Sequence, residues 1–305
     1  MTISDDAPVI GIDAGGTEIK AGLLSGAKIL EKRRYFTERE NGPEHAVAQV
    51  LLAAKEMRDE YPEAKAIGLV VPGIVDAVSG IAEFSENIGW RNVEFKNILE
   101  NAIGLPVGFG HDVRAGGKAE AIYGSGIGYK NSFYISIGTG ISGAMVIDGV
   151  LNENPYSGEI GHFDVNTGIS CPCGSSGCLE TIATAPSIVR NYNKNSLTSL
   201  SNARQVLDLV KMGDPIALEA WSHAVDAVAI SLAAYVTILA PEVIIFGGGV
   251  SRAGDFLLNP IREHFDKKLI MQKAPILVMA KFGDEAGMIG AGLLGSDALI
   301  KSDLK

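Results

Sequence analysis

The three cysteines of this chain stand close together, in the segment Cys171-Pro-Cys173-Gly-Ser-Ser-Gly-Cys178, and His162 lies nine positions before the first of them. Three thiolates and one imidazole form a complete tetrahedral set for zinc, with no coordination position left for water or substrate. We therefore predict a structural zinc site made of these four residues. The alternative is a redox site, or a disulfide that leaves one cysteine unpaired.

Two glutamates flank this segment: Glu159 precedes it and Glu180 follows it. A metal that fixes the backbone here would also hold these two carboxylates in position for a ligand. The alternative is a zinc ribbon that serves stability alone.

Glycine turns follow several apolar runs. Two of them, Gly15-Gly16-Thr17 and Gly138-Thr139-Gly140, stand between apolar segments and predict a strand, a tight turn and a second strand. Glycine lets the backbone approach oxygen atoms closely, and the amides of such turns bind phosphate without cationic side chains. A third run, Gly247-Gly248-Gly249, follows a short buried strand. One turn alone would indicate a simple chain reversal, whereas the three together predict a nucleotide site.

Two other glycine-rich patterns are excluded by their context. Residues 138–143 match GxGxxG, but a dinucleotide site needs a helix after the turn, and residues 143–147 read as a strand. The segment Gly116-Gly117-Lys118-Ala119 lacks the first glycine of a Walker A loop and the Ser or Thr after its lysine. An NAD enzyme is therefore the less favoured alternative.

The rest of the chain alternates between strand-like and helix-like segments, which is typical of an α/β fold. We expect strands over residues 66–71, 107–109, 132–137, 243–246 and 276–279, and helices over residues 44–60, 113–123, 203–212, 215–239, 256–268 and 284–296. Two sheet domains with a cleft between them fit this pattern, with ligands near the strand ends where the glycine turns cluster. The two strand–turn–strand units suggest an internal duplication.

Composition limits the partners of the chain. Its 305 residues are 47% hydrophobic and carry a net charge of −10, which argues against nucleic acids and anionic membranes as partners. Residues 1–7 are polar and acidic, so we expect no signal peptide. The longest uncharged apolar stretch, residues 227–241, is too short to span a bilayer. We therefore expect a cytoplasmic protein. In the cytoplasm thiols stay reduced, which agrees with cysteines that bind a metal rather than form disulfides.

Taken together, the motifs resemble those of the ROK sugar kinases (repressor, open reading frame, kinase), and the resemblance covers nearly the whole chain. Its carrying motifs are Asp13-Ala-Gly-Gly-Thr17, Gly110-His-Asp112 through Ala119-Glu120, Ile137-Gly-Thr-Gly140, Glu159-Ile-Gly-His162, Cys171-x-Cys173-x4-Cys178-Leu-Glu180 and Gly247-Gly-Gly249. The cysteine motif, with a glutamate two residues after the last cysteine, is highly specific.

The resemblance implies a two-lobed actin/hexokinase-like (ribonuclease H-like) ATPase fold with a cleft between the lobes. We expect residues 1–111 with 289–305 to form a small α/β lobe and residues 112–288 to form a large α/β lobe with the zinc-binding insert. The family binds zinc through the residues that match His162, Cys171, Cys173 and Cys178. The ATP-binding residues that it implies are Asp13, Gly15, Gly16, Thr17, Lys20, Gly138, Thr139, Gly140, Gly247, Gly248 and Gly249. Asp13 would face the phosphates and a hydrated Mg²⁺.

The resemblance also implies a sugar site and a catalytic base. The substrate-binding residues that it implies are Gly73, Asn87, His111, Asp112, Glu159, His162 and Glu180. The Glu159 and Glu180 carboxylates would accept hydrogen bonds from sugar hydroxyl groups, and His162 would give one ring nitrogen to zinc and offer the other to a hydroxyl group. Phosphoryl transfer to a hydroxyl group needs a carboxylate within hydrogen-bond reach of that group, and Asp112 matches the general base of the family. The alternative is that Asp112 is an ordinary helix N-cap. His111 departs from the asparagine usual in the family, and its imidazole would titrate near neutral pH, which bears on the preferred sugar.

The implied reaction is ATP-dependent phosphorylation of a hexose at the 6-hydroxyl, with glucose favoured. The alternatives are an N-acetylmannosamine or N-acetylglucosamine kinase and, more distantly, a non-catalytic sugar-sensing protein. A repressor of the family would carry a helix-turn-helix before its first strand, and only eight residues precede Val9 here. We expect sugar and ATP as partners, no nucleic acid and no membrane, and a homo-oligomer, dimer or tetramer.

Overall fold

The computed structural model describes residues 7–304. The chain divides into two compact units: unit 1 comprises Met1–Gly124, Leu151–Ser157 and Asp284–Lys305, and unit 2 comprises Ser125–Val150 and Gly158–Gly283. The sequence prediction placed its boundaries after residues 111 and 288, so the two divisions differ over residues 112–124, 151–157 and 284–288. The expectation that there is no signal peptide concerns residues 1–7, and residues 1–6 lie outside the described part of the chain.

Unit 1 is built on a mixed five-stranded sheet with the order β3-β2-β1-β4-β8. Its strands are β1 (Val9–Ala14), β2 (Glu18–Ser25), β3 (Lys28–Phe36), β4 (Ile67–Val71) and β8 (Val107–His111). β1 pairs antiparallel with β2 and parallel with β4, and β4 pairs parallel with β8. This arrangement brings the carboxyl ends of β1, β4 and β8 to one edge of the sheet, where ligands bind in open α/β sheets.

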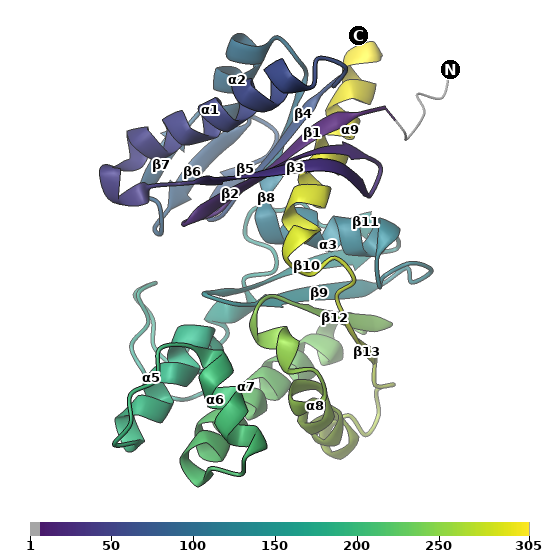
Figure 1. The fold of residues 1–305 in the computed structure, drawn as a ribbon. Coiled ribbons are helices and arrows are strands. Elements are labelled where there is room, and N and C mark those ends of the chain that lie inside the picture. The colour runs from purple at the N-terminus through teal and green to yellow at the C-terminus, as the bar shows by residue number, and fades with distance from the viewer. Residues whose placement is uncertain (1–6, 305) are drawn as a thin grey trace. The chain divides into compact units, whose positions relative to one another are not determined.

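Helices cover both faces of this sheet (Figure 1). They are α1 (Pro43–Glu60), α2 (Phe95–Ile103), α3 (Asp112–Tyr123) and α9 (Ala286–Asp303), with single turns η1 (Arg39–Asn41) and η4 (Gly283–Glu285). Alternate strand residues such as Ile10 and Ile12 lie fully buried in the core that includes α1 and α2. A three-stranded antiparallel sheet completes the unit, formed by β5 (Ile74–Asp76), β6 (Ile81–Ser85) and β7 (Trp90–Val93).

The C-terminal helix α9 packs directly against the opposite face of the sheet. The strand residues on that face include Gly68 and Gly108, and a β-carbon on either would collide with a carbonyl oxygen of α9, at Ala291 and Leu294 respectively. Glycine is therefore required for the close backbone approach between helix and sheet. The helix expected over residues 284–296 is observed, although it begins at Ala286 and reaches Asp303.

Unit 2 repeats the topology of unit 1 around a second five-stranded sheet, β11-β10-β9-β12-β13. Its strands are β9 (Ser132–Ile137), β10 (Ile141–Ile147), β11 (Val150–Leu151), β12 (Val243–Gly247) and β13 (Ile276–Met279). β9 pairs antiparallel with β10 and parallel with β12, and β12 pairs parallel with β13. The corresponding strands of unit 1 pair in the same directions, as an internal duplication predicts.

The helices of unit 2 pack on one another around α7 (Figure 1). They are α4 (Glu180–Ala183), α5 (Ala185–Asn195), α6 (Ala203–Lys211), α7 (Pro215–Leu239) and α8 (Asp255–Lys268), with single turns η2 (Ile160–His162) and η3 (Val250–Ala253). Asp214 caps α7 by accepting a hydrogen bond from the Ala217 amide at 2.8 Å, as its position before Pro215 predicts.

Helix α7 is long and apolar enough to cross a membrane by length and composition, with 25 residues. The sequence prediction considered only residues 227–241 and found them too short, so it missed this property. The helix contributes Trp221, Val228 and Leu232 to the buried core of unit 2, and the Trp221 indole N–H donates to the Phe256 carbonyl at 3.0 Å. Such burial is typical of the core helix of a globular unit.

Candidate functional site

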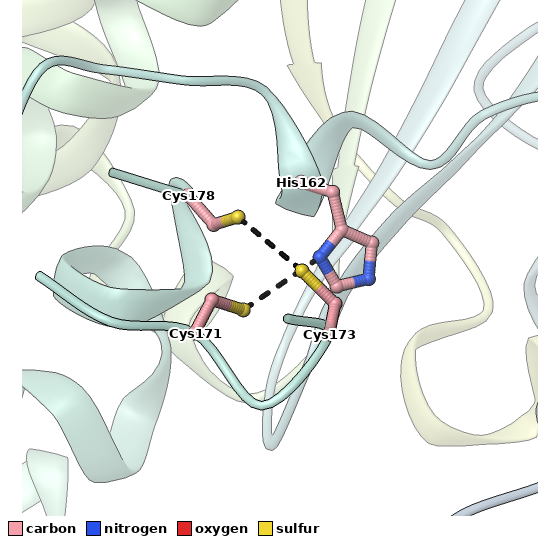
Figure 2. A group of neighbouring side chains, drawn as sticks. All are labelled: His162, Cys171, Cys173 and Cys178. Atoms are coloured by element: carbon pink, nitrogen blue, oxygen red, sulfur yellow. Dashed lines mark hydrogen bonds between the residues drawn. The ribbon is translucent and has the colours of Figure 1, made fainter. Parts of the chain in front are cut away.

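The predicted metal ligands come together in unit 2. One ligand atom from each of His162, Cys171, Cys173 and Cys178 lies within 4.8 Å of all the others. The Nδ1 atom of His162 is 3.9 Å from the Cys171 sulfur, and the Cys173 and Cys178 sulfurs are 3.7 Å apart (Figure 2). All three cysteines are free thiols, so the disulfide alternative is not what the structure contains. The figure shows the His162 Nε2 atom directed away from the sulfurs.

Short backbone interactions hold this cluster in place. The Cys171 amide donates to the Ser175 carbonyl at 2.8 Å, and the Leu179 amide after Cys178 donates to the Phe163 carbonyl at 2.9 Å. Gly177, between the second and third cysteines, has φ = +80°, and a β-carbon there would collide with the Asp164 carboxylate. The cysteine segment therefore folds back against the residues next to His162. This explains how His162 and Cys171, nine positions apart in the sequence, reach the same site.

The chemistry of the four donors fits zinc. A backbone hydrogen bond from Ser175, together with those from the neighbouring thiols, lowers the pKa of the Cys173 thiol to about 7, so a thiolate is available near neutral pH. Burial raises the pKa of the Cys178 thiol to about 12, so this residue would release its proton on binding a cation. Soft thiolates with one imidazole are the donors of structural zinc sites.

Glu180 connects the cysteine segment to the glycine turn of unit 2. It is the first residue of α4, two positions after Cys178. One of its carboxylate oxygens, Oε1, accepts a hydrogen bond from the Ile141 amide at 2.5 Å, at the start of β10. β-Carbons on Gly140 and Gly161 would each lie 2.9 Å from this oxygen, so small residues surround it on two sides. The carboxylate therefore fixes the turn between β9 and β10.

The second and third glycine runs also meet in unit 2. The turn after β9 closes with a 2.9 Å hydrogen bond from the Gly138 amide to the Gly140 carbonyl. A β-carbon on Gly138 would lie 4.0 Å from the Gly249 amide nitrogen, and Gly248 has φ = +79° and abuts the Ile137 backbone. Space around Gly249 is open. The backbones of these two turns are therefore adjacent, with open space beside Gly249, as a nucleotide site needs.

The other predicted nucleotide residues of unit 2 differ in their surroundings. Gly247 is the last residue of β12, and the Tyr134 ring occupies the space that a side chain would take. Thr139 stands exposed in the turn after β9. Glu159, the remaining sugar candidate of this unit, is an exposed residue at the start of η2, three positions before His162.

In unit 1 the first glycine turn joins β1 and β2. The Gly15 amide donates to the Glu18 carbonyl at 3.0 Å, and Thr37 holds the turn from outside by donating its hydroxyl to the Gly15 carbonyl at 2.6 Å. The Thr37 amide also donates to the Thr17 carbonyl at 3.1 Å. Thr37 is fully buried, whereas Thr17 is exposed. The turn is therefore fixed while its tip faces solvent.

Asp13 is the next-to-last residue of β1 and lies in a buried site near other carboxylates. Burial is the main reason why its pKa rises from 3.8 to about 7, and the neighbouring Asp112 adds to the rise. Lys20, opposite Asp13 on β2, lies 3.8 Å away and offsets part of this effect. A β-carbon on Gly287, at the start of α9, would lie 2.6 Å from an Asp13 carboxylate oxygen. A carboxylate in such a site is a suitable ligand for Mg²⁺.

Asp112 begins α3 directly after β8. Its side chain is 27% exposed, and its Oδ1 atom accepts a hydrogen bond from the Val113 amide at 2.7 Å. The preceding residue, His111, is the N-cap of α3, since its Nδ1 atom accepts a hydrogen bond from the Arg114 amide at 3.4 Å. The cap is thus His111 and not Asp112, so the alternative role of Asp112 as N-cap is not observed.

The His111 side chain is buried, although the sequence analysis assigned this residue to the sugar site. Its side chain is only 6% exposed, and burial is the main cause that lowers its pKa to about 4. The expected titration near neutral pH is therefore wrong, because the imidazole is neutral there. With Nδ1 accepting from Arg114, the proton of the neutral ring is assigned to Nε2.

Two more sugar candidates lie on the loops of unit 1. Gly73 follows β4 with φ = +105°, and a β-carbon there would collide with the Phe84 carbonyl of β6. Asn87 is an exposed residue between β6 and β7, and a β-carbon on Gly16 would lie 3.9 Å from the Asn87 β-carbon. The structure therefore places Asn87 beside the first glycine turn.

Sequence reasoning missed Arg39, the first residue of η1. Its Nη1 atom donates to the Asn87 carbonyl at 3.0 Å, and a β-carbon on Gly16 would lie 3.4 Å from the same atom. No motif marks this arginine, and the segment from Glu38 to Asn41 is charged and polar. Its place at the turn depends on contacts with residues far away in sequence, which no local pattern reveals.

Comparison with known proteins supports the same interpretation. The ROK family model matches residues 9–298. The glucokinase of Thermotoga maritima is 34% identical, and the alignment covers 96% of this chain and 97% of that protein.

Two solved structures are similar over nearly their full length. A ROK hexokinase from Thermus thermophilus has a TM-score of 0.82 at 32% identity, covering 96% of this chain and 99% of its own. A ROK family glucokinase from Streptomyces griseus, in complex with glucose and AMPPNP, has a TM-score of 0.83 at 29% identity, with coverages of 95% and 99%. The predicted α/β fold of the actin/hexokinase-like type is thereby confirmed.

Proposed function

The chain belongs to the ROK family, and from that premise we propose that it is an ATP-dependent hexose kinase that phosphorylates glucose at the 6-hydroxyl. The observation that carries the proposal is the pair of carboxylates in unit 1, Asp13 near the end of β1 and Asp112 directly after β8, close enough to raise the pKa of Asp13. Phosphoryl transfer needs one carboxylate for the metal and one for the acceptor hydroxyl.

The two carboxylates differ in ways that suit these two roles. Asp13 lies next to the Gly15–Gly16 turn and would hold Mg²⁺, which supplies positive charge to the phosphate oxygens when ATP is bound. Asp112 is partly exposed at the start of α3, and a backbone amide orients its Oδ1 atom. It would accept the proton of the 6-hydroxyl as the new phosphate ester bond forms.

The backbone amides of the glycine turns would bind the phosphates of ATP. The residues proposed to bind ATP are Gly15, Gly16, Thr17 and Lys20 in unit 1 and Gly138, Thr139, Gly140, Gly247, Gly248 and Gly249 in unit 2. Oriented amides cost no reorganisation when charge develops on the transferring group, so they stabilise the transition state more than flexible side chains would. Exclusion of water would direct the phosphoryl group to the sugar rather than to solvent.

The sugar would be bound by carboxylates, an amide and imidazoles. We propose Gly73, Asn87, His111, Asp112, Glu159, His162 and Glu180 for this role. Zinc bound through Nδ1 of His162 would fix the ring and leave Nε2 as a hydrogen-bonding atom for a hydroxyl group. The metal would act structurally, because its four protein ligands leave no position for water.

A coupled ADP-release assay with glucose, mannose, N-acetylglucosamine and N-acetylmannosamine tests the proposal. We expect sugar-dependent ADP release with the highest kcat/KM for glucose. A higher value for an acetylated sugar would assign the chain to the amino-sugar kinases instead. ATP binding with no release of ADP for any sugar would point to a sugar-sensing protein. We further propose a cytoplasmic location. We also propose that the protein is a homo-oligomer, and size-exclusion chromatography with light scattering would measure its oligomeric state.

A further inference from the structure

Arg39 is placed where a cation could reach both substrates of a kinase. Its guanidinium lies next to Gly16 in the first phosphate turn and donates to the Asn87 carbonyl at 3.0 Å. Gly16 belongs to the proposed ATP site and Asn87 to the proposed sugar site. A guanidinium carries five N–H donors in a planar fork, so most of them stay available after this single hydrogen bond.

The charge of Arg39 is not neutralised by the protein. Among the described residues 7–304, no carboxylate forms an ion pair with Arg39. The neighbouring cations of the sheet are engaged differently: Lys20 donates to the Asp284 carbonyl at 2.7 Å, and Arg34 pairs with Glu18 at 2.7 Å. An exposed arginine without a carboxylate partner, beside a turn of backbone amides, is suited to an anionic ligand.

The backbone before Arg39 is held in a conformation that directs it to the turn. Thr37 is tied to the turn by two hydrogen bonds, through its hydroxyl to Gly15 and through its amide to Thr17. Glu38 then adopts the left-handed conformation, with φ = 50° and ψ = 42°. This conformation costs a non-glycine residue about 1–2 kcal/mol, so surrounding contacts must hold it.

The Glu38 side chain supplies such a contact. Its Oε2 atom lies 2.7 Å from the His45 Nε2 atom on α1. The left-handed residue is therefore clamped between the phosphate turn on one side and α1 on the other, and the chain reverses so that Arg39 meets Gly16. Retention of a strained residue directly before an unpaired arginine is typical of a functional site.

We propose that Arg39 binds the transferring γ-phosphoryl group of ATP and stabilises its charge in the transition state. This inference rests on the proposed kinase function. A guanidinium forms strong, often bidentate hydrogen bonds with phosphate oxygens, and phosphoryl transfer relies on positioning and charge stabilisation. Through Asn87, the same side chain would hold the acceptor loop next to the donor.

The test compares Arg39→Gln, which can still donate to the Asn87 carbonyl but carries no charge, with Arg39→Lys, which restores a cation. Arg33→Gln is the matched control, because Arg33 is an exposed arginine of β3 that pairs with Glu60 at 2.5 Å. For each protein we would measure kcat and KM with glucose, and the dissociation constants of AMPPNP and ADP by titration calorimetry. Thermal unfolding would verify that each variant is folded.

We expect Arg39→Gln to lower kcat/KM about 10- to 100-fold, as for the loss of a hydrogen bond to a charged group. AMPPNP affinity should fall while ADP affinity stays unchanged, because only AMPPNP carries a γ-phosphoryl group. Arg39→Lys should recover part of the loss, and Arg33→Gln should behave as the parent protein does.

Two results would overturn the proposal. Unchanged AMPPNP affinity and kcat in Arg39→Gln, with a higher KM for glucose alone, would mean that Arg39 only positions Asn87. Equal losses of ADP and AMPPNP affinity would place the arginine away from the γ-phosphoryl group. The binding measurements need no turnover, so they stay decisive even if the parent protein phosphorylates no sugar, which would refute the kinase function separately.

Discussion

Replacing Asp13 with asparagine should stabilise the metal-free protein at pH 8. The Asp13 carboxyl group is 14% exposed, and burial, followed by the charge of Asp112, raises its pKa from 3.8 to about 7. A raised pKa means that the folded state holds the proton more tightly than the unfolded state does. The ionised carboxylate therefore destabilises the fold progressively as the pH rises from about 4 to 7, and the full cost is present above pH 7.

The size of the effect follows from the shift. A rise of roughly 3 pKa units corresponds to about 4 kcal/mol at 1.36 kcal/mol per unit. Asparagine keeps the shape of the side chain but removes the charge, so we expect the variant to be more stable by about 2–4 kcal/mol at pH 8. At pH 5 the advantage should fall by more than half. Such a gain in the free energy of unfolding raises the unfolding temperature by roughly 5–10 °C for a domain as long as unit 1.

Thermal unfolding in chelator at pH 8 and pH 5 measures this difference. Asp76→Asn is an opposite-sign control, because backbone and side-chain hydrogen bonds from Ser79 lower the pKa of Asp76 and its neutralisation should not stabilise. Adding Mg²⁺ and ATP should stabilise the parent protein more than Asp13→Asn. An Asp13→Asn variant that unfolds at a lower temperature than the parent at pH 8 would refute the reasoning, since the ionised carboxylate would then be favourable without metal.

Three further predictions concern the base, the metal centre and the two glutamates. Asp112→Asn should lower kcat by about 10²- to 10⁴-fold in the ADP-release assay and leave AMPPNP binding intact, because the carboxylate acts on the acceptor. Metal analysis of the purified protein should find about one zinc per chain, and Cys173→Ser should lower the unfolding temperature and glucose affinity together. Glu180→Ala, which removes the acceptor of the Ile141 amide, should raise the KM values of both ATP and glucose about 10-fold, whereas Glu159→Ala should raise that of glucose alone.

A specific result would contradict each of these predictions. Substantial turnover by Asp112→Asn would remove this residue from the role of base. An active protein without zinc would refute the metal centre, and unchanged glucose affinity in Cys173→Ser would separate the metal from the sugar site. Identical kinetic changes in Glu180→Ala and Glu159→Ala would show that the contact with Ile141 has no influence on ATP.

The sequence predicted the parts of the molecule that depend on short-range patterns. The metal ligands come together because Cys171, Cys173 and Cys178 lie on one tight segment that folds back toward His162. The strand–turn–strand units at Gly15 and Gly138 are found where glycine interrupts apolar runs. Such signals need no knowledge of distant contacts.

Other features arise from contacts between distant residues and were missed. Strand β3 carries four exposed charged residues in succession, Glu31 to Arg34, so it shows no apolar alternation. Its place is fixed by pairing with β2, and the position of Arg39 by the Asn87 carbonyl, 48 residues further along the chain. His111 ends β8, the edge strand of the unit 1 sheet, and its burial depends on contacts with other parts of the fold, so its low pKa could not be read from the sequence.

The central claim is that this chain transfers the γ-phosphoryl group of ATP to the 6-hydroxyl of a hexose with Asp112 as the base. Phosphorus NMR with proton–phosphorus correlation, applied to the protein incubated with glucose, ATP and Mg²⁺, identifies the product directly. We predict one sugar phosphate, esterified at O6 and formed in equal amount to ADP, which disappears with Asp112→Asn. ADP formation without a sugar phosphate, or a sugar phosphate produced by Asp112→Asn at the parental rate, would contradict the claim.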